Sequence, residues 1–170
     1  MLKPLLAVLV YAAALTAAGQ EKQASLEYLK KNDPDSLNVV VFVEDGCPGT
    51  QRSYERVVEG ELLRARIKRQ PTWSIYEVRL MTHMQCAAQK TGLVFLIAVD
   101  FFATYPVLDP APDESDYYIV RYRDRSNSFF GAFTGYNDSN SVEAEGMLKT
   151  SLRDAVTDAL TDYLKANFGE

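Results

Sequence analysis

Residues 76–86 and 93–105 constrain the fold more than any other part of the chain, because they are predicted to be two adjacent β-strands. In residues 76–86 apolar and polar side chains largely alternate, which is typical of a strand with one buried face. Residues 93–105 are strongly apolar, and Asp100 is their only charged residue. The loop between the two segments would close an antiparallel hairpin with Cys86 opposite Leu93.

This register gives the hairpin one apolar face and one polar face. On the polar face, Arg79 lies opposite Asp100 and His83 lies opposite Leu96. A shift of one residue would move Asp100 onto the apolar face, and burying an unpaired charge is costly. The pattern therefore predicts which side chains share a face as well as where the strands are.

Other segments are predicted to extend this hairpin into a sheet. Residues 63–67 alternate in the same way and would add a third strand. Residues 39–43 form a continuous apolar run, which is typical of a strand buried on both faces. Residues 117–124 and 129–135 are predicted to form a further hairpin. The result is an antiparallel β-meander sheet of about five or six strands.

The C-terminal segment is predicted to be a long amphipathic helix. Apolar residues recur at helical spacing over residues 148–164, and Asn140 or Ser141 can cap the helix. Such a helix must bury its apolar stripe, so we expect it to pack on one face of the sheet. Residues 21–31 and 50–58 are predicted to be short N-terminal helices. The predicted fold class is therefore α+β.

The chain begins with the pattern of a secretory signal peptide. Lys3 is the only charge before Glu21, an apolar run follows Lys3, and small residues close the segment. We therefore predict a cleaved signal peptide over residues 1–19, an N-terminal helix and linker over 20–36, and one α+β domain over 37–170.

A cleaved signal predicts a periplasmic or secreted protein, and its short length favours a bacterial periplasm. After its removal, no apolar stretch has the length of a membrane-spanning helix. The formal net charge is −5, and the loss of Lys3 makes it one unit more negative. Because general nucleic-acid binding requires a basic surface, we expect no nucleic-acid partner.

Cys47 and Cys86 are the only cysteines, and in an oxidising compartment they are predicted to form a disulfide. A reactive thiol at Cys47 is one alternative, although Thr50 stands where thioredoxin-type sites carry their second cysteine. Two inert thiols are the other alternative.

His83 is the only histidine, so a catalytic triad or dyad would have to use it. Its predicted place on the polar face of a strand favours a surface or hydrogen-bonding role instead. An acidic loop lacks the spacing and the glycine of an EF-hand, and its members are Asp109, Asp113, Glu114 and Asp116. We therefore predict no metal site and no cofactor.

Basic residues are concentrated in one short segment: Arg52, Arg56, Arg64, Arg66, Lys68 and Arg69. Together with Arg79, two of them, Arg64 and Arg66, are candidate binding residues for an anionic partner such as a phosphate group, a carboxylate-bearing glycan or an acidic protein surface. Alternatively, the basic side chains pair across strands with Glu77 and Asp100 on an ordinary polar sheet face.

Aromatic residues are dense in a second region: Tyr105, Tyr117, Tyr118, Tyr122, Phe129, Phe130, Phe133 and Tyr136. Alternation along strands cannot send all of them into one core. Tyr118, Tyr122 and Phe130 are therefore candidate anchors for a partner. A second small core is the alternative.

These features favour a non-enzymatic binding or accessory protein that acts by protein–protein contact in the cell envelope or outside the cell. An immunity-type inhibitor and a regulator of an envelope enzyme are two versions of this function. The alternatives are a small secreted enzyme that uses His83 or Cys47 and a carrier of a small molecule or lipid. The sequence leaves the partner and the oligomeric state open.

Overall fold

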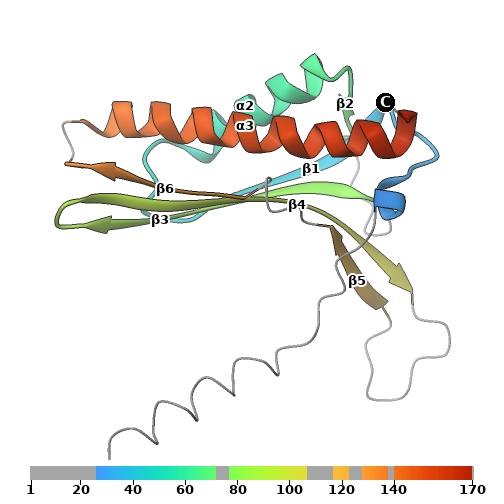
Figure 1. Cartoon of the computed structure of the whole chain (residues 1–170), viewed down its shortest axis with the longest axis horizontal. Helices are drawn as coiled ribbons and strands as arrows, with labels where there is room; N and C mark the ends of the chain where they lie inside the picture. The colour runs from blue at the N-terminus through green and yellow to red at the C-terminus, as the bar shows by residue number, and fades with distance from the viewer. Residues whose placement is uncertain (1–25, 72–76, 107–116, 123–127, 138–139, 170) are drawn as a thin grey trace, which may run out of the picture.

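The computed structural model describes residues 26–71, 77–106, 117–122, 128–137 and 140–169 (Figure 1). The predicted signal peptide lies outside these residues. The elements in chain order are η2 (Leu26–Leu29), β1 (Ser36–Val43), α2 (Gln51–Arg64), β2 (Lys68–Arg69), β3 (Arg79–Gln89), β4 (Gly92–Pro106), β5 (Tyr117–Tyr122), β6 (Ser128–Thr134) and α3 (Ser141–Phe168).

The strands form one open six-stranded sheet in the order β2-β1-β3-β4-β5, and β6 also pairs with β4. The α+β fold class with a long C-terminal helix is confirmed. The prediction of a wholly antiparallel meander is wrong, because β1 runs parallel to both β2 and β3. α2 connects β1 to β2. It carries the chain back to the end of the sheet at which β1 begins, so that β2 can run parallel to β1.

The strand predicted over residues 63–67 is absent, because α2 extends to Arg64 and a turn follows it. Tyr54, Val58 and Leu62 are buried at a spacing of four residues, which is a helical period. Leu63, which strand alternation would have buried, is exposed. The alternation over residues 63–67 therefore falls at the end of an amphipathic helix and in the turn after it, and not in a strand.

Thr50 caps α2, as the sequence predicts, and the helix is longer than predicted. The Ser53 backbone N–H donates a hydrogen bond to Thr50 Oγ1 at 3.2 Å, and the Thr50 backbone N–H donates to Ser53 Oγ at 3.4 Å. This reciprocal capping box satisfies backbone groups that the first helical turn leaves free. Of the predicted helix over residues 21–31, the structure describes only the short 3-10 turn η2.

β3 and β4 form the predicted hairpin, with a register that differs by two residues from the predicted one. Met81, and not Arg79, lies opposite Asp100, and His83 lies opposite Ala98. The reason is a tighter turn, since pairing continues to Gln89 opposite Gly92. A shift by two residues leaves every side chain on its predicted face, because the strand period is two.

β5 and β6 do not pair as the predicted hairpin in the described part of the chain. β4 is 15 residues long, and each strand pairs with a different half of it. β6 pairs with residues 92–98, and β5 pairs with residues 101–106. Both pairings are antiparallel.

Both long helices lie on the same side of the sheet (Figure 1). The α3 face that meets the sheet carries buried residues, including Leu148, Leu152, Ala155, Val156, Ala159, Leu160 and Tyr163. Phe101 of β4 stacks on Tyr163 with ring centroids 5.7 Å apart. No helix of the described residues covers the other face of the sheet (Figure 1).

Candidate binding surface

Three large apolar side chains are exposed on the sheet face opposite α3. Phe42 is 52% exposed, Leu96 36% and Phe130 74%. The strand register places Leu96 between Gln85 and Phe130, and it places His83 between Phe42 and Ala98. We call the surface formed by Phe42, His83, Gln85, Leu96, Ala98 and Phe130 the open face.

A hollow with a volume of about 300 Å³ lies at one end of the open face. Glu44, which follows β1, and Gln85 of β3 line one side of it, and Leu96 of β4 and Phe130 of β6 line the other. The hollow therefore joins an apolar wall to a polar one, a combination that suits a projecting side chain of a partner.

The polar wall is a hydrogen-bonded group centred on Glu44. Gln85 Nε2 donates to Glu44 Oε1 at 2.7 Å, and His83 Nε2 lies 2.9 Å from the same oxygen. The hydrogen bond from Gln85 is the main cause of a lowered pKa for the Glu44 carboxyl; desolvation opposes this shift, and His83 adds to it. Glu44 therefore holds its negative charge at the rim of the hollow.

The loop that carries Glu44 is tied to β3 and to α2. Cys47 and Cys86 form the predicted disulfide, with their Cα atoms 5.0 Å apart. The Glu44 N–H donates to the Met84 carbonyl at 2.9 Å, and the Tyr54 hydroxyl donates to the Pro48 carbonyl. Since both sulfurs are bonded, the alternative of a reactive thiol at Cys47 is not realised.

Arg79 is buried on the sheet and is only 3% exposed. Its guanidinium carbon lies 4.1 Å from the centroid of the Phe102 ring, and Nη2 donates to the Thr104 hydroxyl at 3.0 Å. Arg79 therefore packs against its own sheet, and a partner would not reach it at the surface.

Arg64 and Arg66 lie at the end of α2, on the helix side of the sheet, so the structure does not bring them together with the open face. Arg64 forms an ion pair with Glu61 one helical turn earlier. Arg66 is exposed in the following turn, with a positive φ of 59°. Arg69 likewise pairs with Glu59, so two of the basic residues pair with glutamates of α2.

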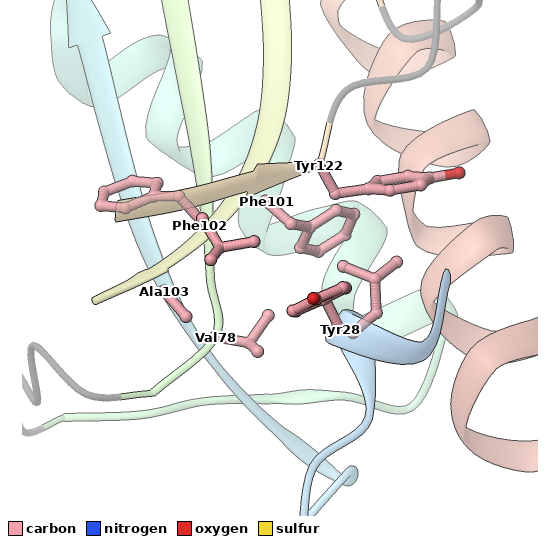
Figure 2. A pocket seen from close by; sticks show the side chains of 8 residues that line it. Tyr28, Val78, Phe101, Phe102, Ala103 and Tyr122 are labelled. Atoms are coloured by element: carbon pink, nitrogen blue, oxygen red, sulfur yellow. The ribbon is translucent and has the colours of Figure 1, made fainter. Parts of the chain in front are cut away.

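The predicted aromatic anchors separate into different environments. Phe130 is on the open face, whereas Tyr122 is buried and its hydroxyl donates to Asp162 Oδ2 at 3.0 Å. Figure 2 shows Tyr122 beside Phe101, with its hydroxyl directed towards a helix. Tyr118 pairs with Tyr105 through the backbone, and its side chain lies outside the described part.

Figure 2 shows a small pocket between Tyr28, Val78 and Phe101 at the edge of the core. Its volume is about 10 Å³. A space of this size is close to that of one water molecule, so it does not hold a larger ligand. The pocket is therefore part of the packing between η2 and the sheet.

Sequence reasoning missed Phe42 and Leu96 as surface residues. The continuous apolar run over residues 39–43 predicts a strand buried on both faces, yet alternation places Phe42 on the face opposite Val39 and Val41. The predicted register already places Leu96 opposite His83 on the polar face, and this placement is a sufficient signal that Leu96 is exposed.

No family model matches the sequence, and no curated protein matches it. A minor lipoprotein from Acinetobacter baumannii is among the solved structures that match the chain. It has a TM-score of 0.35 and 11% sequence identity, and the match covers 78% of this chain and 92% of the lipoprotein. At that TM-score, the likeness supports no statement about fold or function.

The described residues contain neither a candidate membrane-spanning helix nor a candidate metal-binding cluster. None of the helices found there combines the length and the apolar character that a membrane crossing requires. Over the same residues, His, Cys, Asp and Glu side chains do not gather in groups of three that could hold a metal ion.

Proposed function

We propose that this chain is an extracytoplasmic binding protein that holds a protein partner on the open face. The observation that carries the proposal is the exposure of Phe42, Leu96 and Phe130 on one sheet face. Single exposed apolar residues are ordinary, but a group of them beside a hollow is typical of an interaction site. Aromatic side chains are also the residues that most often anchor such contacts.

The disulfide supports the extracytoplasmic part of this proposal. Cys47 and Cys86 are bonded across 39 residues of sequence, and such bonds persist in oxidising compartments. The predicted signal peptide points to the same compartment. The periplasm or the extracellular space is therefore where we expect the partner.

The chemistry of the open face indicates what the partner presents. Leu96 and Phe130 offer an apolar wall that would take an aliphatic or aromatic side chain. Glu44 keeps its negative charge at the rim, so a lysine or arginine next to that side chain would be favoured. We therefore expect an apolar residue flanked by a basic one.

The proposal is tested by comparing two phenylalanines of similar exposure. Phe42 is 52% exposed on the open face, and Phe168 is 49% exposed at the end of α3. Proteins captured from an envelope extract by the wild-type chain would be identified, and the affinity of each purified candidate would be measured by calorimetry. Phe42→Ser should weaken binding by about tenfold or more, because a buried aromatic contact is lost.

Phe168→Ser is the matched control, and it should bind as the wild type does. Leu96→Ser should repeat the loss seen with Phe42→Ser. Equal affinity of the wild type, Phe42→Ser and Leu96→Ser for every captured protein would refute the open face as the binding surface.

A further inference from the structure

β6 lies at an edge of the sheet formed by the described strands. One edge of this strand pairs with β4, and none of the strands in the described ranges pairs with the other edge. Its seven residues, Ser128–Thr134, include no charged residue and no proline. Natural sheets usually protect such an edge with charges, proline, a bulge or a covering element. An edge strand without charge or proline is suited to pairing with another strand.

The direction of the backbone groups of β6 follows from one hydrogen bond. The Gly135 N–H donates to the Thr91 carbonyl at 2.8 Å, and this pair continues the β4–β6 register in which Gly92 lies opposite Thr134. Hydrogen-bonded pairs alternate along an antiparallel ladder. The residues that direct their N–H and C=O groups away from β4 are therefore Ser128, Phe130, Ala132 and Thr134.

We propose that this edge pairs with β6 of a second copy of the chain, in an antiparallel arrangement with a two-fold axis at Gly131. A two-fold interface requires that the same surface be complementary to itself. The strand sequence is nearly symmetric about Gly131, with a phenylalanine two residues away on each side and a hydroxyl residue at each end. Phe129 would then lie opposite Phe133 of the second copy.

The outward backbone groups match this register. Ser128 would lie opposite Thr134 of the second copy, and Phe130 would lie opposite Ala132. These residues are the ones whose N–H and C=O groups point away from β4, so both pairs can form two hydrogen bonds. A register shifted by one residue would pair outward-directed groups with inward-directed ones.

The side chains also fit the proposed pairing. Phe130 is 74% exposed and would face the small Ala132 of the second copy, so the aromatic ring meets no bulky neighbour. At the two-fold axis, Gly131 has no side chain, and a Cβ there would lie 2.5 Å from the Phe95 ring. Since β6 is uncharged, the pairing also places no like charges opposite each other.

This inference goes beyond the proposed function. It concerns the edge of the sheet, which shares Phe130 with the open face, and its tests change Ser128, Ala132 and Thr134, which lie outside the open face as defined. The molar mass of the full exported protein would be measured by sedimentation equilibrium. We expect the mass of two chains for the wild type. Ala132→Pro removes an outward N–H without removing a bond to β4, so it should give the mass of one chain.

Ala132→Ser keeps the outward N–H and should remain a dimer. If Ala132→Pro fails to fold, as judged by circular dichroism, Thr134→Pro blocks the same edge and should likewise be a monomer. A monomeric wild type, or a folded proline variant that is still a dimer, would overturn the proposal.

Cysteine cross-linking tests the register. Ser128→Cys/Thr134→Cys should form a covalent dimer under oxidising conditions, because the two positions face each other across the axis. Within one chain these positions are about 20 Å apart, so they cannot bond to each other. Ser128→Cys alone should not cross-link, since its own symmetry mate is equally distant. A double variant that stays monomeric on a non-reducing gel would exclude this register.

Discussion

The Ser53 hydroxyl donates a hydrogen bond of 2.8 Å to Glu145 Oε1, which ties the first turn of α2 to the beginning of α3. Lys149 Nζ lies 2.6 Å from the same oxygen. The Glu145 carboxylate is thereby held over Gly49, where an added Cβ would lie 2.5 Å from its carboxyl carbon. Two elements that are distant in sequence thus meet at one carboxylate beside the N-terminus of a helix.

This contact makes Gly49 intolerant of a side chain. Its φ is 92°, which disfavours any residue other than glycine, and the carboxylate that would have to move is bound by Ser53 and Lys149. Gly49→Ala should lower the free energy of unfolding by about 1–3 kcal/mol. Gly60→Ala is the control, since a Cβ there meets nothing within 4 Å, and it should stabilise α2 by about 0.5–1 kcal/mol. Urea denaturation would measure both changes in stability. Equal midpoints for Gly49→Ala and Gly60→Ala would show that Gly49 tolerates a side chain as well as Gly60 does.

Glu145 should also make stability depend on pH. The hydrogen bond from Lys149, followed by that from Ser53, lowers the pKa of the Glu145 carboxyl in the folded protein from 4.5. A lowered folded pKa means that the stabilisation is present above the unfolded pKa and is lost as the pH falls through the folded pKa. Glu145→Gln should therefore show a smaller loss of stability than the wild type as the pH is lowered below about 4.5. If the free energy of unfolding fell equally with pH in the wild type and in Glu145→Gln, Glu145 would make no such contribution to stability.

Local patterns in the sequence were sufficient for α3 and for the faces of the β3–β4 hairpin. The α3 stripe repeats over many turns, and Gly169 follows its end with a φ of 72°. In the hairpin, the two-residue difference in register did not change the face on which each side chain lies, so Asp100 is on its predicted face. Strong periodicity over a long segment thus predicted which side chains lie together.

Non-local pairing could not be read from the same patterns. The parallel alignment of β1 with β3 depends on the path of α2, and α2 was partly hidden because residues 63–67 also alternate. The candidate site shows the same limit. Strand alternation predicted that Arg79 and Tyr122 could contact a partner. In the folded chain Arg79 packs against Phe102 and Thr104, and Tyr122 binds α3 through its hydroxyl.

The disulfide should contribute a large share of the stability. It closes a loop with a sequence separation of 39 residues, for which the chain-entropy model gives about 4 kcal/mol. Cys47→Ser/Cys86→Ser should therefore unfold at a lower urea concentration, and a reductant should not lower its midpoint further. The wild type treated with the same reductant should approach the variant. An unchanged midpoint in the double variant would show that the bond does not stabilise the fold.

Tyr163 should stabilise the fold through its hydroxyl as well as through its ring. The ring stacks on Phe101, and the hydroxyl donates to the Pro34 carbonyl at 3.0 Å. Tyr163→Phe keeps the stacked ring and removes the donor, so it should cost about 1 kcal/mol. Tyr163→Ala also removes the buried ring and should cost about 3–5 kcal/mol, because it leaves a cavity in the core. The two variants would be compared by urea denaturation. If Tyr163→Phe were as stable as the wild type, the bond to the segment before β1 would add nothing, and the stacked ring alone would account for the loss in Tyr163→Ala.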